Sequence, residues 1–354
     1  MKLSILIPVG SVHEYFVESI KSVLDDAPLD SEILICATAA VIADAKTQLG
    51  NQPMDQRLKF VRSEHGDIVT NLNNGLLIAK GEYIARMDTD DVVIPTRFSK
   101  QIAYLDKISN ADVVGSYLQY ICPHGVDKGM QDYPRRIKRS IFGLASPKVA
   151  HPSVMMRRSI VVALGMYSYE YPHVEDLELW LRVLRAGEIH NITQPLLKYR
   201  LHPGQISRKK SDEQLKNSLI AFINDSRWIA KLPPIKPGHF NQLAIEDFFL
   251  ERTKLLQDLN LFTRIFFMVK LQEKYLERFC LGYLHSMPPH KLINEFIQAK
   301  TDITVATQIK RNLFGFLLIL FKIITRRLIA RFTRAGRQIS INQKDSTSLC
   351  PDCI

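Results

Sequence analysis

Three aspartates lie in one short stretch, at a spacing that suits chemistry at a phosphate group. Asp88, Asp90 and Asp91 follow the apolar residues 83–85, which predict the end of a buried strand. Alternate residues of an extended segment point to the same side, so Asp88 and Asp90 can face one ligand. Two carboxylates repel each other unless a cation lies between them, and a divalent metal carrying phosphates fits because hard cations prefer oxygen ligands. The alternative is a solvated acidic turn at a strand end.

The elements around this stretch alternate between strands and helices. Residues 3–9 form a continuous β-rich run that stops at Pro8 and Gly10, as a strand buried on both faces does. Further strands are expected at 32–36, 58–61 and 83–87, and helices at 15–24, 41–49 and 70–79. This alternation predicts a parallel, wound sheet, in which ligands bind at the carboxyl ends of strands. Asp88 to Asp91 lie at such an end, which favours a ligand site over an acidic turn.

A second carboxylate pair, Glu175 and Asp176, lies farther along the chain. Before it we expect a helix at 96–108, strands at 111–121 and 149–156, and a polar loop at 124–139. Residues 171–184 predict a loop that becomes an amphipathic helix at Asp176 or just after it. A helix N-terminus favours an ionised carboxylate, and the alternative role for the pair is helix capping by Asp176. Residues 192–201 predict the last strand.

After about residue 210 the pattern changes to successive helical runs with proline-rich joints. We predict an α/β domain over 1–210, a helical extension over 211–305, a basic amphipathic helix within 306–340, and a flexible tail over 341–354. A chain of 354 residues with 46% hydrophobic residues is long enough for one large domain and an appendage.

The net charge of +11 is concentrated near the C-terminus. Residues 301–354 hold nine Lys/Arg and three Asp/Glu, and no acidic residue occurs between Lys310 and Lys344. A basic amphipathic helix is drawn to anionic lipid at a membrane interface. The alternative is a helix packed on the protein with a solvated basic face. Aromatic residues are not interleaved with these charges for base stacking, so nucleic acid is not the expected partner.

The cysteines and the N-terminus indicate the compartment. Five scattered cysteines (Cys36, Cys122, Cys280, Cys350 and Cys353) make no disulfide framework, and a reducing cytoplasm fits better. Cys350 and Cys353 have the spacing of a metal or redox pair but no companion pair, so we interpret them as a free terminus. The apolar run at 3–7 is too short for a signal peptide, and no segment reaches the roughly 20 apolar residues of a spanning helix. We expect a cytoplasmic protein, peripheral on the inner face of the plasma membrane.

Several stretches together resemble the family 2 glycosyltransferases. They are residues 4–9, 19–23, 72–76, 79–91, 151–154, 175–182 and 199–202. The resemblance covers residues 3 to about 207 and implies the GT-A fold, a Rossmann-like, mostly parallel α/β sheet, here with a helical C-terminal extension. It also implies transfer of a sugar from a nucleotide sugar, expected to be UDP-linked, to an acceptor hydroxyl with inversion.

The resemblance further implies a role for each site residue. Asp90 would be the direct ligand of Mn²⁺ or Mg²⁺, with Asp88 on the ribose or the metal and Asp91 supporting both. His202 and Arg200 would hold the diphosphate or the metal. Asp176 would be the base that takes the acceptor proton, and Glu175 would orient the acceptor or donor. The residues expected to bind the nucleotide sugar are Pro8, Val9, Asp67, Asn73, Asp88, Arg97 and Arg200.

The sequence departs from the family pattern where the nucleoside is usually gripped. The family has an acidic cluster after the second strand, whereas residues 35–40 here contain no carboxylate. Gly10 and Ser11 follow Val9 where an aromatic residue and an asparagine are common. We therefore assign base recognition to Asp67 or to the backbone around Pro8 and Val9.

Three functions follow as hypotheses. The first is a membrane-associated hexosyl- or N-acetylhexosaminyltransferase that extends a lipid-linked or polysaccharide acceptor in O-antigen-like or capsule-like surface glycan synthesis. The second is a non-catalytic membrane-associated scaffold on the same fold, suggested by the missing nucleoside carboxylate. The third is a sugar nucleotidylyltransferase, which needs a glycine-rich phosphate loop after the first strand, where only Gly10 is present.

Overall fold

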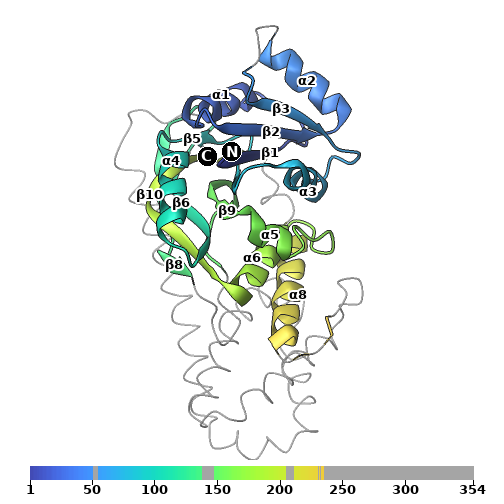
Figure 1. Cartoon of the computed structure of the whole chain (residues 1–354). Helices are drawn as coiled ribbons and strands as arrows, with labels where there is room; N and C mark the ends of the chain where they lie inside the picture. The colour runs from blue at the N-terminus through green and yellow to red at the C-terminus, as the bar shows by residue number, and fades with distance from the viewer. Residues whose placement is uncertain (51–54, 138–146, 205–210, 230, 232, 235–354) are drawn as a thin grey trace, which may run out of the picture. The chain divides into compact units, whose positions relative to one another are not determined.

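The computed structural model describes residues 1–50, 55–137, 147–204, 211–229, 231 and 233–234 (Figure 1). The predicted amphipathic helix within 306–340, the tail 341–354 and most of the helical extension lie outside these residues. None of the helices in the described ranges combines the length and the apolar character that a bilayer crossing requires.

Four parallel strands form the N-terminal half of the sheet. They are β1 (Leu3–Pro8), β2 (Ser31–Ala37), β3 (Leu58–Arg62) and β4 (Tyr83–Arg86). β1 is central, because Leu3 is in register with Ser31 of β2 on one side and Tyr83 of β4 on the other. Every residue of β1 and β2 is buried, as the uninterrupted apolar runs predict.

Helices cover both faces of this sheet (Figure 1). They are α1 (Phe16–Asp26), α2 (Ala39–Leu49), α3 (Ile68–Ile78), α4 (Arg97–Lys107), α5 (Arg158–Ala163) and α6 (Glu175–Ala186). The alternation of side chains along β1 divides the core into two clusters. Ile5 packs in the cluster that holds residues of α1, α2 and α4, and Leu6 packs in the one that holds residues of α3, α5 and α6.

The second half of the sheet is mixed. Its strands are β5 (Val92–Val93), β6 (Ala111–Ile121), β7 (Asp127–Gln131), β8 (Arg136–Ile137), β9 (Met155–Arg157) and β10 (Glu188–Arg200). The order is β3-β2-β1-β4-β9-β6-β10-β5, with β7 on β6 and β8 on β10. β9 is antiparallel to both β4 and β6, whereas β6 and β10 are parallel. The α/β class with a mostly parallel central sheet is confirmed.

Two segments differ from the sequence prediction. Residues 124–139 were expected to be a loop, but β7 and β8 lie there. β7 pairs with the long strand β6, and β8 pairs with the long strand β10. The side chains of β7 are mostly exposed. Residues 149–156 were expected to be one strand, but His151–Ser153 form a 3₁₀ turn before β9 begins. Pro152 has no N–H to donate to a sheet, which favours the turn.

One helix of the described chain lies beyond residue 210. α8 (Ser211–Ile229) contributes Ile220, Ala221 and Phe222 to a third apolar cluster, whose other members precede or belong to α6. Asp225 of α8 accepts a 2.9 Å ion-paired hydrogen bond from Arg185 of α6. α8 lies where the sequence predicts helices, while the helical extension as a whole and the domain division near 210 stay predictions.

A network of buried hydrogen bonds connects the amino ends of β1, β2 and β4. Ser4 Oγ donates to Glu32 Oε1 at 2.7 Å and accepts from the backbone N of Gly81 at 2.8 Å. Glu32 also accepts from Lys59 Nζ at 2.8 Å and from the backbone N of Lys80 at 2.7 Å. Gly81 lies so close to β1 that a Cβ added there would be 2.3 Å from the backbone N of Ser4. Only glycine fits this approach.

Gly81→Ala is expected to lower the free energy of unfolding by roughly 2 to 3 kcal/mol, because the methyl group forces β4 away from β1. Urea denaturation of the two proteins measures the difference. Gly66→Ala is the matched control, since its Cβ would meet only Thr38 Cγ2 at 3.5 Å and should change stability by less than about 0.5 kcal/mol. Equal stability of the Gly81 variant and the wild type would contradict the close packing.

Candidate active site

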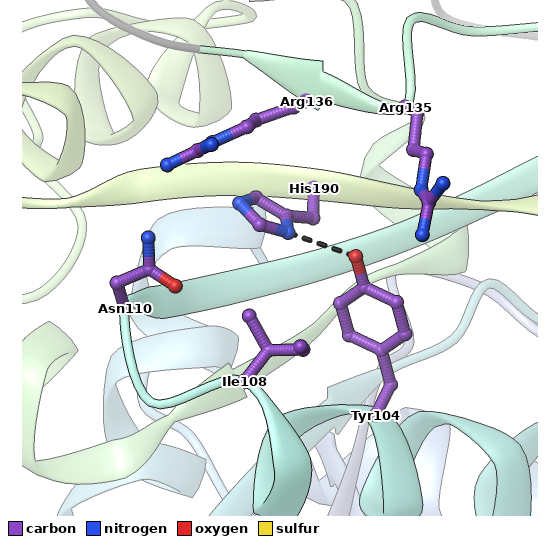
Figure 2. A pocket seen from close by; sticks show the side chains of 6 residues that line it. All are labelled: Tyr104, Ile108, Asn110, Arg135, Arg136 and His190. Carbon is purple, nitrogen blue, oxygen red and sulfur yellow. Dashed lines mark hydrogen bonds between the residues drawn. The ribbon is translucent and has the colours of Figure 1, made fainter.

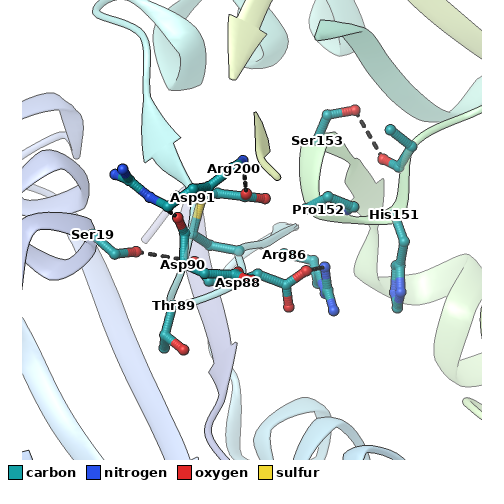
Figure 3. A network of polar contacts seen from close by, with 12 residues as sticks. Ser19, Arg86, Asp88, Thr89, Asp90, Asp91, His151, Pro152, Ser153 and Arg200 are labelled. Carbon is teal, nitrogen blue, oxygen red and sulfur yellow. Dashed lines mark hydrogen bonds and ion pairs between the residues drawn. The ribbon is translucent and has the colours of Figure 1, made fainter. Parts of the chain in front are cut away.

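An acidic cluster follows β4 at the carboxyl end of the sheet. Carboxylate oxygens of Asp88, Asp90 and Asp91 all lie within 4.8 Å of one another (Figure 3). The cluster occupies the strand end that the sequence predicted. Asp91 is fully buried, and its Oδ2 has no hydrogen-bond partner among the residues that the structure describes.

Elements distant in sequence hold this loop in place. Ser19 Oγ of α1 donates to the carbonyl of Asp88 at 3.0 Å (Figure 3). The backbone N of Arg200, at the end of β10, donates to Asp91 Oδ1 at 3.0 Å. His202 Nε2 donates to Asp90 Oδ2 at 2.9 Å. The cluster is therefore clamped between α1 and the end of β10.

The guanidinium of Arg200 strengthens this clamp. Its Nε donates to the carbonyl of Asp90 at 2.9 Å, and its terminal nitrogens donate to the carbonyl of Pro123 at 2.7 Å and to Glu18 Oε2 at 2.6 Å. The same group stacks over the ring of Tyr15, 4.4 Å from its centroid. These contacts make Arg200 a positioning residue for the acidic loop, while its predicted contact with the diphosphate stays a prediction.

The electrostatics of the cluster favour a bound cation. Burial raises the pKa of Asp91 well above its ordinary value, and the charges of Asp90 and Asp88 raise it further. Burial likewise raises the pKa of Asp88, with Asp90 adding to the effect. Three converging carboxylates, one with an unpaired buried oxygen, fit a divalent cation with a preference for oxygen ligands. Asp88, Asp90 and Asp91 are the residues that could hold it.

The second carboxylate pair lies in the first turn of α6, which begins at Glu175, slightly earlier than expected. Asp176 Oδ1 accepts from the backbone N of Leu177 at 2.7 Å. Burial raises the pKa of Asp176, while this hydrogen bond and the positive charge of Arg86 oppose the rise. Burial, then the charge of Asp176, raises the pKa of Glu175 to about 7, and its Oε2 has no partner among the described residues.

The two acidic groups lie within electrostatic reach of each other. The charge of Asp176 contributes to the raised pKa of Asp88, and the charge of Asp88 contributes to that of Glu175. The fold thus brings together the two carboxylate groups that the sequence selected, although 84 residues or more separate them in the chain. Chemically, three clustered carboxylates can hold a cation, and a carboxylate of the second pair can accept a proton.

The residues expected to bind the nucleoside lie at the ends of β1 and α3. Pro8 and Val9 are buried, and the backbone N of Val9 donates to the carbonyl of Cys36 at 2.9 Å. Asp67 is the N-cap of α3, accepting from the backbone N of Thr70 at 2.9 Å and from its hydroxyl at 2.6 Å. These bonds hold the pKa of Asp67 below its ordinary value although burial opposes them. The donor roles of Pro8, Val9 and Asp67 stay predictions.

Two further predicted donor ligands are bonded within the protein. Asn73 exchanges hydrogen bonds with the backbone of Tyr167, donating at 2.9 Å and accepting at 3.0 Å. Arg97 is fully buried and donates to the carbonyls of Arg86 at 2.7 Å and Pro152 at 2.9 Å. Burial lowers the pKa of Arg97 to about 9. In this structure both side chains connect elements around the site.

Sequence reasoning missed Arg86, the last residue of β4. Its side chain is only 4% exposed and forms an ion pair with Asp88 (Figure 3). The signal was a single cation in an otherwise apolar strand, directly before the acidic triplet. Sequence reasoning also missed His13, whose Nε2 lies 3.0 Å from the hydroxyl of Thr89 within the acidic loop.

A separate cavity of about 400 Å³ lies at the amino ends of β6 and β10 (Figure 2). Its lining residues are Tyr104, Ile108, Asn110, Arg135, Arg136 and His190. His190 bonds to the hydroxyl of Tyr104 and to Glu188 Oε2, each at 2.9 Å, and Arg136 pairs with Glu188. Most polar groups of this cavity therefore have partners within the protein, and it lies at the opposite strand ends from the acidic cluster.

The chain is similar to known glycosyltransferases. Residues 4–165 match the family described as Glycosyl transferase family 2. The O-antigen biosynthesis glycosyltransferase WbnJ of Escherichia coli is 29% identical over 204 residues, covering 56% of this chain and 80% of WbnJ. An uncharacterized glycosyltransferase of Haemophilus influenzae is 28% identical over 229 residues, covering 60% of this chain and 69% of its own length.

Among solved structures, the crystal structure of S. aureus TarS 1-349 in complex with UDP aligns with this chain at a TM-score of 0.47 and 15% identity. The alignment covers 64% of this chain and 66% of that chain. A TM-score below 0.5 is too low to carry ligands or residue roles from one protein to the other.

Arg97→Lys is expected to lower the free energy of unfolding by about 2 to 3 kcal/mol, because lysine cannot reach both carbonyls and leaves a buried acceptor unpaired. Chemical denaturation measures the loss, with the exposed Arg135→Lys as control. An Arg97 variant as stable as the wild type, but with weaker nucleoside diphosphate binding, would instead make Arg97 a direct donor ligand.

Proposed function

Because this chain is a family 2 glycosyltransferase with the GT-A fold, we propose that it moves a sugar from a nucleotide sugar to an acceptor hydroxyl with inversion. The proposal rests on one observation: two groups of carboxylates lie close to each other in the fold. One is the cluster of three aspartates at the end of β4, and the other is the pair at the start of α6. A transferase of this kind needs one group for the leaving diphosphate and another for the acceptor proton.

The acidic cluster serves the leaving group. Asp90, held by His202, is the main ligand of Mn²⁺ or Mg²⁺, and Asp88 and Asp91 complete the site. When bound, the metal acts as a Lewis acid that neutralises negative charge developing on the diphosphate. The backbone N of Arg200 fixes Asp91, so the ligand oxygens are already in position before the donor arrives.

Asp176 serves the acceptor. As the acceptor oxygen attacks the anomeric carbon, its proton passes to the Asp176 carboxylate while the bond from that carbon to the diphosphate oxygen breaks. Inversion requires such a base on the face opposite the leaving group. Glu175, with its unpaired buried oxygen, is the residue that orients the acceptor or the donor sugar.

We propose that the donor is a UDP-linked hexose or N-acetylhexosamine, which binds through Asp67 and the backbone at Pro8 and Val9. The name of WbnJ assigns that relative to O-antigen biosynthesis, which supports a lipid-linked or polysaccharide acceptor here. The basic amphipathic helix that the sequence predicts within 306–340 would hold the enzyme on the inner face of the plasma membrane, close to a lipid-linked acceptor.

Asp90→Asn and Asp176→Asn should separate the two roles. The Asp176 variant should keep Mn²⁺-dependent binding of nucleoside diphosphate but lose roughly 10²- to 10⁴-fold in transfer rate, because the base is absent. The Asp90 variant should lose the metal dependence of binding. Calorimetry and diphosphate release from a panel of nucleotide sugars measure these effects, with the exposed Asp25→Asn as control. Wild-type rates in both variants would refute the site assignment.

The transfer rate should fall in acid at a pH set by Asp176. The base works only when ionised, and burial raises its pKa. kcat/KM should therefore decrease as the pH falls through this raised pKa, above the value of about 3.9 expected for an exposed aspartate. A pH–rate profile measures the position of this limb. A limb at the ordinary aspartate value would contradict a buried carboxylate base.

A further inference from the structure

Arg86 lies between the two acidic groups of the site. It ends β4, two residues before Asp88, and its terminal nitrogen forms an ion pair with Asp88 Oδ2. Figure 3 shows its side chain extending from Asp88 toward His151. Its Nε is buried and has no hydrogen-bond partner among the residues that the structure describes. A charged side chain that is only 4% exposed is costly to bury unless its charge is needed there.

The charge of Arg86 acts on both acidic groups. In the acidic cluster it pairs with Asp88. At the start of α6, burial raises the pKa of Glu175 and Asp176, and the charge of Arg86 opposes that rise in both. Two other buried arginines lie beside the cluster. The side chain of Arg97 bonds to backbone carbonyls, Met87 Sδ and Gln101, and the guanidinium of Arg200 bonds to the carbonyls of Asp90 and Pro123 and to Glu18. Arg86 is therefore a buried arginine whose guanidinium pairs directly with a carboxylate of the acidic cluster.

A divalent metal at the cluster must compete with this arginine. Both cations are attracted by the carboxylate of Asp88, and they repel each other at short range. The metal alone adds two positive charges beside a guanidinium that already offsets one of the three aspartates. A nucleoside diphosphate brings negative charge that relieves this repulsion, so the metal and the diphosphate favour each other's binding.

We propose that Arg86 is a built-in countercation, which pairs with Asp88 when no metal is bound and keeps the affinity for free divalent metal low. The metal then binds together with the diphosphate of the donor and does not occupy the site before the donor arrives. The proposal rests on the metal–diphosphate site of the proposed function. It assigns Arg86 a positioning and affinity-setting role, with no contact to the reacting atoms.

Titration of the full-length protein with MnCl₂ alone tests the proposal by calorimetry. Arg86→Gln removes the charge but keeps an amide donor for Asp88, and it should bind Mn²⁺ at least about tenfold more tightly than the wild type. Arg86→Lys keeps the charge and should bind within about threefold of the wild type. Lys107→Gln is the matched control: it also removes one positive charge, but from an exposed side chain at the end of α4, and it should leave Mn²⁺ binding unchanged. A merely structural role would weaken metal binding in both Arg86 variants.

Equal or weaker Mn²⁺ binding by a folded Arg86→Gln protein would overturn the role of Arg86. Absence of Mn²⁺ binding by every protein, with or without uridine diphosphate, would instead overturn the proposed metal site. If Arg86→Gln fails to fold, the wild type decides. Mn²⁺ should then bind at least about tenfold more tightly with uridine diphosphate present than without it, and equal affinities would refute the proposal.

Discussion

Repulsion among five carboxyl groups is the constraint around which the site is built. Asp88, Asp90 and Asp91 meet at the end of β4, and Glu175 and Asp176 lie within electrostatic reach at the start of α6. Such a gathering is unfavourable unless hydrogen bonds and positive charges offset it. The backbone N of Arg200, the ring of His202 and the guanidinium of Arg86 each offset part of this repulsion. A divalent metal with its diphosphate would offset the remainder.

The fold explains how so many charges can be held in fixed positions. β4 lies beside the central strand β1, fully buried, and delivers the acidic loop at its carboxyl end. β10 ends near the same loop. There Arg200 and His202 contact Asp90 and Asp91, from which they are separated by more than 100 residues of sequence. Buried Arg97 bonds the end of β4 to the turn at Pro152. The separate cavity at the amino ends of β6 and β10 takes no part in this arrangement.

Much of this arrangement could be predicted from the sequence. Apolar runs located β1, β2 and β4, and with β4 the position of Asp88 to Asp91 at the carboxyl end of the sheet. That a ligand binds at this end stays a prediction. The resemblance to a family then selected Asp176 and His202. The network around Arg200 and the ion pair of Arg86 could not be predicted, because spacing along the chain does not reveal which distant side chains meet. β7 and β8 escaped prediction because edge strands with exposed polar side chains lack the apolar pattern of buried ones.

The central claim is that the three aspartates bind a metal and a nucleoside diphosphate as one unit. Thermal unfolding of the wild type with Mn²⁺ and a panel of nucleoside diphosphates tests it most directly, since a ligand that binds the folded state raises the midpoint. The account predicts that one diphosphate raises the midpoint strongly with Mn²⁺ and far less when Mn²⁺ is chelated. Stabilisation of the same size with and without the metal would contradict it.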